Sequence, residues 1–126
     1  DMSRVQIINE QNKVLVFTNL SCLSVDESPR VMNEAVRVIA EHPEQSVYSL
    51  IDMTEMRFNK VVIARATDIA RKNAPYVRAT AVVGLNSVAK LIAKSIIKLT
   101  GRNTVLFDEL EEAKNWLLYE SSRSST

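Results

Sequence analysis

The apolar side chains of this chain recur with two periods, which predicts a strand hairpin followed by alternating helices and strands. Residues 4–9 (RVQIIN) and 13–20 (KVLVFTNL) are rich in β-branched and large apolar side chains, and the polar link 10–12 suits a hairpin turn. In the segments that separate the later predicted strands, apolar side chains recur every three or four residues, as on one face of a helix. Three more short apolar runs are predicted strands: 47–51, 77–84 and 103–107.

The predicted element order is therefore ββαβαβαβα, with short loops. Because connections between parallel strands are right-handed, this order predicts an α/β domain with a five-stranded mixed, mainly parallel sheet and four helices packed on it. The second half of 77–84 is nearly continuously apolar, as in strands that helices cover on both faces. We expect one domain over residues 1–120 and a polar, disordered tail over 121–126.

The first two predicted helices begin at residues with capping chemistry. Ser24 and Glu27 have the spacing of a capping box, so a helix is expected within 24–41. Asn59 is expected to cap a second helix over 60–72, since its side-chain oxygen can accept from a free backbone N–H.

The third and fourth helices carry similar signals. Asn86 or Ser87 is expected to cap the third helix, and Gly101 to end it. Asp108 and Glu111 have capping-box spacing and predict the start of the fourth helix. The inner face of the third helix is predicted to consist of Val88, Leu91, Ile92, Ser95 and Leu99.

Composition excludes several classes of function. The net charge of the 126 residues is +1, whereas nucleic-acid binders show a clear basic excess. One histidine, His42, and one cysteine, Cys22, do not make a His/Cys metal cluster. His42 precedes a proline at a predicted helix end and is expected to be a surface cap, and Cys22 is expected to be a structural thiol rather than a nucleophile. Two glycines do not make a phosphate loop, and no apolar run is long enough for a membrane span. We expect a non-enzymatic cytoplasmic protein with no cofactor, metal, nucleic acid or integral membrane segment, and a partly buried Cys22 thiol.

Polar residues follow three predicted parallel strands, at the sheet edge where open α/β folds usually bind ligands. Asp52 and Asp108 end two of these strands, and Asn86 and Ser87 follow the third. The free N–H groups of the helix that begins there could hold a small anion, with Lys90 one turn further on. Each residue also has a structural interpretation, because Asp52 can anchor its loop and the others can cap helices. The sequence leaves both interpretations open.

The third helix also presents a lysine stripe, at Lys90, Lys94 and Lys98. Such a stripe is a solvated face or a docking surface for an acidic partner or an anionic membrane. Apolar side chains predicted to face water near it indicate a protein contact such as a homodimer interface: Val61, Ile63 and Ile97.

The stretch from Tyr48 to Leu118 resembles the SpoIIAA-like group of bacterial STAS-type domains, which are related in fold to the CRAL-TRIO lipid-binding domain. Three motifs carry the resemblance, in the same strand–helix order: YSLIDMTEM, RATAVVGLNSVAKLIAKSIIKLTG and LFDELEEAKNWL. The resemblance implies a mixed sheet with an antiparallel edge strand and helices packed around it.

STAS domains of the anti-sigma-antagonist type act by binding proteins and are switched by phosphorylation of a serine at the start of their second helix. In this chain that position falls near 57–60 (RFNK), and no serine occurs from Thr54 to Ile63. The phosphoswitch is therefore not carried over by the resemblance, although Thr54 offers a hydroxyl earlier in the loop.

Three hypotheses for function remain. The first is a regulatory module that binds a protein through the exposed second and third helices and through a loop with Asp52, Thr54, Phe58, Asn59 and Lys60. The second, by analogy with CRAL-TRIO domains, is a carrier of a small apolar or lipid-like ligand, in a pocket lined by Met53, Met56, Phe58 and Tyr76. The third is an enzyme that uses Asp52 or Asp108 with an anion at 86–87.

Overall fold

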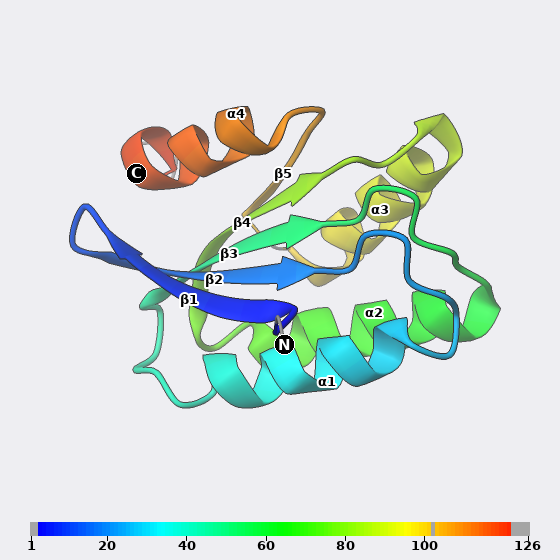
Figure 1. Cartoon of the computed structure of the whole chain (residues 1–126), viewed down its shortest axis with the longest axis horizontal. Helices are drawn as coiled ribbons and strands as arrows, with labels where there is room; N and C mark the ends of the chain where they lie inside the picture. The colour runs from blue at the N-terminus through cyan, green and yellow to red at the C-terminus, as the bar shows by residue number, and fades with distance from the viewer. Residues whose placement is uncertain (1–2, 102, 122–126) are drawn as a thin grey trace.

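A computed structural model describes residues 3–101 and 103–121 of the chain, and its elements follow the predicted order (Figure 1). The five strands form one sheet, and the C-terminal helix ends in a π-helical turn. The elements are β1 (Val5–Glu10), β2 (Lys13–Asn19), α1 (Ser28–Ile39), β3 (Val47–Asp52), α2 (Lys60–Asn73), β4 (Val77–Val83), α3 (Ser87–Thr100), β5 (Thr104–Phe107), α4 (Leu110–Asn115) and η1 (Trp116–Glu120).

The predicted N-terminal hairpin is confirmed. β1 and β2 are antiparallel, and their pairing closes at Glu10 and Lys13. The turn between them has two residues, Gln11 and Asn12, with φ of 53° and 59°. Two-residue hairpin turns of this handedness match the right-handed twist of the strands, and asparagine tolerates positive φ well.

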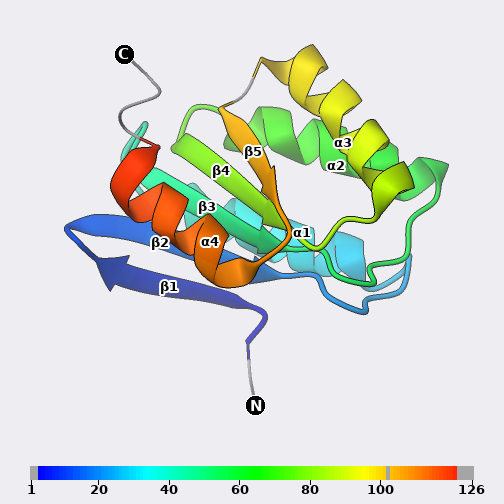
Figure 2. The ribbon, with the colours of Figure 1, turned by 90° about the horizontal axis from the view of Figure 1, so that it is seen from above.

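The strand order places three helices on one face of the sheet. The strands lie side by side in chain order, β1-β2-β3-β4-β5, and β2 to β5 are parallel. Each right-handed crossover therefore steps in the same direction, which puts every crossover helix on the same side. Figures 1 and 2 show α1, α2 and α3 on one face and α4 on the other.

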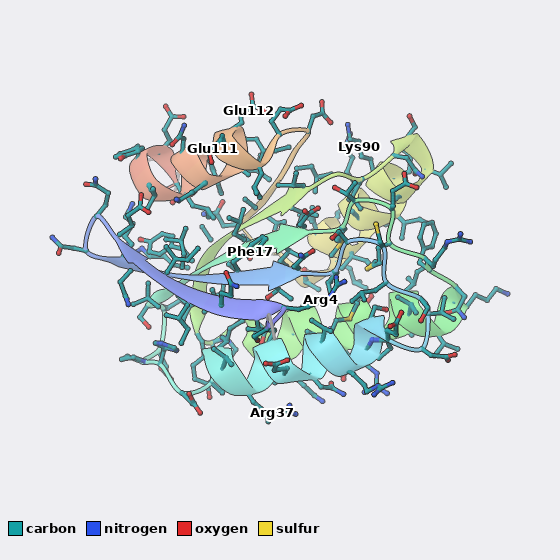
Figure 3. All side chains as sticks on the ribbon, viewed as in Figure 1. Arg4, Phe17, Arg37, Lys90, Glu111 and Glu112 are labelled. Atoms are coloured by element: carbon teal, nitrogen blue, oxygen red, sulfur yellow. The ribbon has the colours of Figure 1, made fainter. Side chains whose placement is uncertain are left out.

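The two faces have separate cores. On the α4 face, Leu15 of β2 and Tyr48 of β3 pack with Leu117. Lys13 Nζ donates to the Leu117 carbonyl oxygen over 3.2 Å, which ties the hairpin to η1. On the face of the crossover helices, Ile39 of α1 is buried against the sheet. Figure 3 shows Glu111 and Glu112 on the outer side of α4, where both are exposed.

Most of the predicted helix caps are present. The Asn59 side chain accepts a hydrogen bond from the backbone N–H of Val62, the third residue of α2, over 2.9 Å. The Asn86 side chain accepts in the same way from Ala89, the third residue of α3, over 2.9 Å. Gly101 ends α3 with a left-handed φ of 64°. Ser24 and Glu27 form the reciprocal capping box, although the regular helix begins only at Ser28.

Two predictions about the C-terminal part of the chain are wrong. Asp108 does not cap α4: the residue before that helix is Glu109, which makes no side-chain cap bond, and Asp108 pairs instead with Lys90. Ser121, assigned to the tail, is buried, and its hydroxyl donates to the Leu117 carbonyl oxygen over 2.9 Å. The rest of the predicted tail, 122–126, lies outside the described residues.

The predicted inner face of α3 is also wrong, except for Ile92. Val88, Leu91 and Leu99 are exposed, as is Ser95. The face toward the sheet consists instead of Ala89, Ile92, Ala93, Ile96, Ile97 and Thr100. The cause is composition: α3 is apolar around most of its circumference, so periodicity alone does not choose the buried side.

Candidate functional site

An apolar cavity of about 180 Å³ lies between the sheet and its crossover helices. Its walls come from α1, α2 and α3, and its floor from β2 to β5. Aliphatic and methionine side chains make up most of the lining, and no charged side chain belongs to it within the described part of the chain. The cavity is partly open to solvent. An enclosed apolar cavity of about 150 Å³ binds benzene, so the volume here is sufficient for a small apolar molecule.

Small side chains on two facing helices keep the cavity open. Ala66 and Ala70 of α2 and Ala89 and Ala93 of α3 all line it. Residues four positions apart lie on the same side of a helix, so each helix presents a pair of methyl groups where larger side chains would fill the space. Protein interiors normally contain few voids larger than a water molecule. The two pairs of alanines therefore explain why side chains do not fill the space between α2, α3 and the sheet.

The α3 wall is attached to the fold less firmly than the other helices. None of its 14 residues, all of which are described, is buried. Its first turn is held by the Asn86 cap and by an ion pair in which Lys90 Nζ lies 2.9 Å from Asp108 Oδ1. Lys90 and Asp108 are among the residues predicted for a ligand site, and the structure uses them to join the start of α3 to the end of β5.

The cavity floor contains hydroxyl groups among its apolar side chains. Ser49 of β3, Thr80 of β4 and Thr104 of β5 all line the cavity. Ser49 is paired with Thr80, and Thr80 with Thr104, so the three residues stand in one row across neighbouring strands. The sequence analysis missed this row, because it appears only once the strand register is known.

Asp52 and Thr54 form a tight turn at the carboxyl end of β3. Asp52 Oδ1 accepts from the Thr54 backbone N–H over 3.0 Å and from the Thr54 hydroxyl over 2.7 Å. The Thr54 carbonyl oxygen accepts from the Cys22 N–H, and a Cβ added to Gly84 would lie 2.9 Å from Thr54 Cα. The loop-anchoring interpretation of Asp52 therefore accounts for one of its carboxylate oxygens.

The predicted ligand residues at this sheet edge do not line the cavity, with the exception of Phe58. Asp52, Thr54, Asn59, Lys60, Asn86, Ser87 and Lys90 all lie outside its lining. The physical reason is the strand order. Ligand crevices at strand ends form where the strand order reverses, and β1 to β5 follow one another without reversal. The cavity lies instead between the helix layer and the sheet.

The pocket expected for an apolar ligand is only partly as predicted. Met53, Met56 and Phe58 line the cavity. Tyr76 does not, because it packs on the core between α1 and the sheet.

The structure offers little catalytic chemistry. Among the described residues, no group of three or more His, Cys, Asp and Glu side chains could hold a metal ion. His42 hydrogen-bonds the Val38 carbonyl oxygen through Nδ1 at the end of α1. Cys22 is exposed and has a φ of 62°, so the expectation of a partly buried thiol is wrong. No helix in the described ranges is long and apolar enough to cross a membrane.

The outer side of α3 combines exposed apolar side chains with lysines. Val88, Leu91 and Leu99 are 63%, 68% and 67% exposed, and Lys94 and Lys98 are exposed beside them. Val61, at the start of α2, is exposed as predicted. Ile63 and Ile97 are not part of this surface, because both line the cavity.

Comparison with known proteins establishes the type of fold. No family model matches the chain, and no curated protein matches it significantly. The chain is similar in structure to an uncharacterised protein of the DUF3478 family with a SpoIIAA-like fold from Shewanella loihica PV-4. The two share 15% sequence identity over 90% of this chain and 91% of the other, with a TM-score of 0.69. At this identity the likeness shows the fold alone. The chain thus has the SpoIIAA-like fold that its motifs predicted.

Proposed function

We propose that this domain is a non-enzymatic binding module that holds a small apolar molecule between its sheet and the helices α2 and α3. The cavity of about 180 Å³ carries the proposal. The cavity is partly open to solvent, so its apolar walls are in contact with water when no molecule is bound. A bound apolar molecule would be stabilised by covering this surface, at about 25 cal/mol per Å² of apolar area removed from water.

The chemistry of the lining supports binding rather than catalysis. Apart from aliphatic, aromatic and methionine side chains, the cavity is lined by hydroxyls and one amide, Asn73, among the described residues. A hydroxyl needs an adjacent base to become a nucleophile. We propose no catalytic base for this site. We therefore propose that the domain carries or senses the bound molecule.

Binding of naphthalene to the purified protein tests the proposal, since its size suits a cavity somewhat larger than one that holds benzene. We expect chemical-shift changes in the nuclear magnetic resonance spectrum at residues of the lining. Ala66→Leu places three more carbon atoms in the cavity and should abolish these changes. Ala64→Leu makes the same substitution at an exposed position of α2 and should leave them intact. Absence of any binding by the wild-type protein, or equal binding by both variants, would overturn the proposal.

Native mass spectrometry of protein purified from cells supplies a second test. A co-purifying molecule of low mass is expected in the wild-type protein and not in Ala66→Leu. If both proteins carry the same molecule, it lies elsewhere and the cavity is not its site.

A protein partner is the second candidate function, and the outer side of α3 favours it. Leu91 and Leu99 are exposed next to Lys94 and Lys98, and α3 contains no acidic residue. This charge pattern complements an acidic amphipathic segment of another protein. Oppositely charged amphipathic surfaces bind by covering apolar side chains and by pairing charges at the rim.

A designed helical peptide with leucine on one face and glutamate on the flanks tests this second candidate. Titration should shift resonances on the outer side of α3, and the affinity should fall as salt is added. Leu91→Ser should weaken binding, whereas Arg37→Ser, on α1, should not. Shifts that appear with vesicles of phosphatidylglycerol and not with the peptide would replace the protein partner with a membrane surface. Concentration-dependent self-association that Leu91→Ser abolishes, without peptide binding, would replace it with a second copy of the chain.

A further inference from the structure

The hydroxyl row on the cavity floor depends on an irregularity in the sheet. Val47 is paired with Val77, but the next residue, Tyr48, is paired with Ala79, so Arg78 is an extra residue in β4. Successive side chains of a strand point to opposite faces, and a one-residue shift therefore exchanges the faces for all residues that follow. Without the extra residue, Thr80 would point toward α4.

The register shift consequently turns Thr80 toward the cavity. There it joins Ser49 on one side and Thr104 on the other. Ser49 and Thr80 have only 3% and 7% of their surface exposed, so both residues lie in the interior rather than in bulk solvent. Bulges of this kind are found where a side chain is re-aimed next to a functional site.

The row offers hydrogen bonds without charge. A hydroxyl has one donor and two acceptor lone pairs, so it can bind a ligand group in addition to a partner that it already has. Neighbouring strands lie about 4.8 Å apart, so a ligand oxygen placed above the row lies within reach of two hydroxyls. An ionised ligand would exchange part of its hydration for a lining that contains no charged side chain within the described residues, and this exchange is unfavourable.

The geometry points to a ligand with a compact apolar body and one uncharged hydrogen-bonding group, an alcohol or a ketone, which binds the Ser49–Thr80–Thr104 row. This inference rests on the proposed function and adds the chemical class of the ligand. The apolar body lies against the alanine and isoleucine side chains of α2 and α3. The polar group selects among molecules of the same shape.

Three probes of nearly equal shape test the inference: 2-naphthol, 2-methylnaphthalene and 2-naphthoate. We expect the wild-type protein to bind 2-naphthol about three- to tenfold more tightly than 2-methylnaphthalene, the factor that one net hydrogen bond supplies. Binding of the anionic 2-naphthoate should be weaker than that of either neutral probe. Dissociation constants come from titrations followed by nuclear magnetic resonance.

Variants locate the hydrogen bond. Thr80→Val and Thr104→Val remove a hydroxyl and keep a β-branched side chain, and we expect at least one of them to abolish the preference for 2-naphthol while 2-methylnaphthalene still binds. Thr18→Val is the matched control. Thr18 also lines the cavity, but it lies on β2 in register with Ile51, two residues along from the row.

The outcomes separate this inference from the proposed function. If none of the probes and no naphthalene binds, the proposed function fails. If 2-methylnaphthalene binds as tightly as 2-naphthol, or if 2-naphthoate binds best, the cavity is a ligand site but the inference about the row is wrong. The comparison of probes needs only the wild-type protein, so it tests the inference about the row even if a variant does not fold.

Discussion

Replacement of Gly84 by alanine should destabilise the domain more than the same replacement at Gly101. Gly84 has a φ of 89°, a conformation that costs a residue with a Cβ about 1–3 kcal/mol. The new Cβ would also overlap the Thr54 hydroxyl and lie 2.9 Å from Thr54 Cα, so the loop after β3 has to move. Overpacking of this kind costs about 1–3 kcal/mol. We expect a total loss of about 2–6 kcal/mol.

Gly101→Ala is the matched control, because Gly101 also has a left-handed φ, of 64°, but no atom within 4 Å of the position of a Cβ. Only the backbone cost of about 1–2 kcal/mol remains there. Urea denaturation followed by circular dichroism and by Trp116 fluorescence measures both variants. Thermal denaturation followed by the same signals gives the melting temperatures. Since 1 kcal/mol corresponds to about 3–5 °C for a domain of this size, the contact with Thr54, about 1–3 kcal/mol, should make them differ by about 3–15 °C. Equal losses in the two variants would refute the reasoning, because contact with Thr54 would then contribute nothing.

Three further predictions concern single interactions. Asn86→Ala should lower the free energy of unfolding by about 1 kcal/mol, measured by urea denaturation, because it removes the α3 cap. A double-mutant cycle on Lys90 and Asp108, whose side chains are 35% and 75% exposed, should give less than about 1 kcal/mol, and nothing in high salt. Hydrogen bonds from Ser24, backbone first and then side chain, lower the pKa of Glu27, so its ionised form favours folding. This contribution is present above the pKa of the unfolded chain and is lost as pH falls through the folded pKa. Glu27→Gln should therefore destabilise at neutral pH and match the wild type in acid, and a loss independent of pH would contradict this.

Local patterns were sufficient to predict the element order. The capping asparagines at 59 and 86 and the glycine at 101 lie where the sequence indicates, because a cap depends only on the adjacent helical turn. The hairpin was predictable for the same reason, since two β-rich runs and a short polar link act within a few residues of one another.

Features that depend on tertiary packing were not predictable. α3 is apolar on two sides, and only the position of the sheet decides that Ile96 faces inward and Leu91 outward. Asp108 has the spacing of a cap, but Lys90 lies close enough in space to form an ion pair with it. The residues predicted to bind a ligand lie at the sheet edge, whereas the cavity lies between the helices and the sheet, and its position depends on a strand order that the sequence pattern does not give. Thr80 reaches the cavity only through a register shift that no periodicity reveals.

The absence of buried residues in α3, all of whose residues are described, has a kinetic consequence for the cavity. Regions with few buried contacts open locally at a smaller free-energy cost than the whole domain. Amide hydrogens of α3 should therefore exchange with solvent earlier than those of β3, four of whose six residues are buried. Because the cavity is already partly open to solvent, local opening of α3 would widen its entrance while the sheet and the other helices stay folded, so exchange of a bound molecule would not require unfolding of the domain.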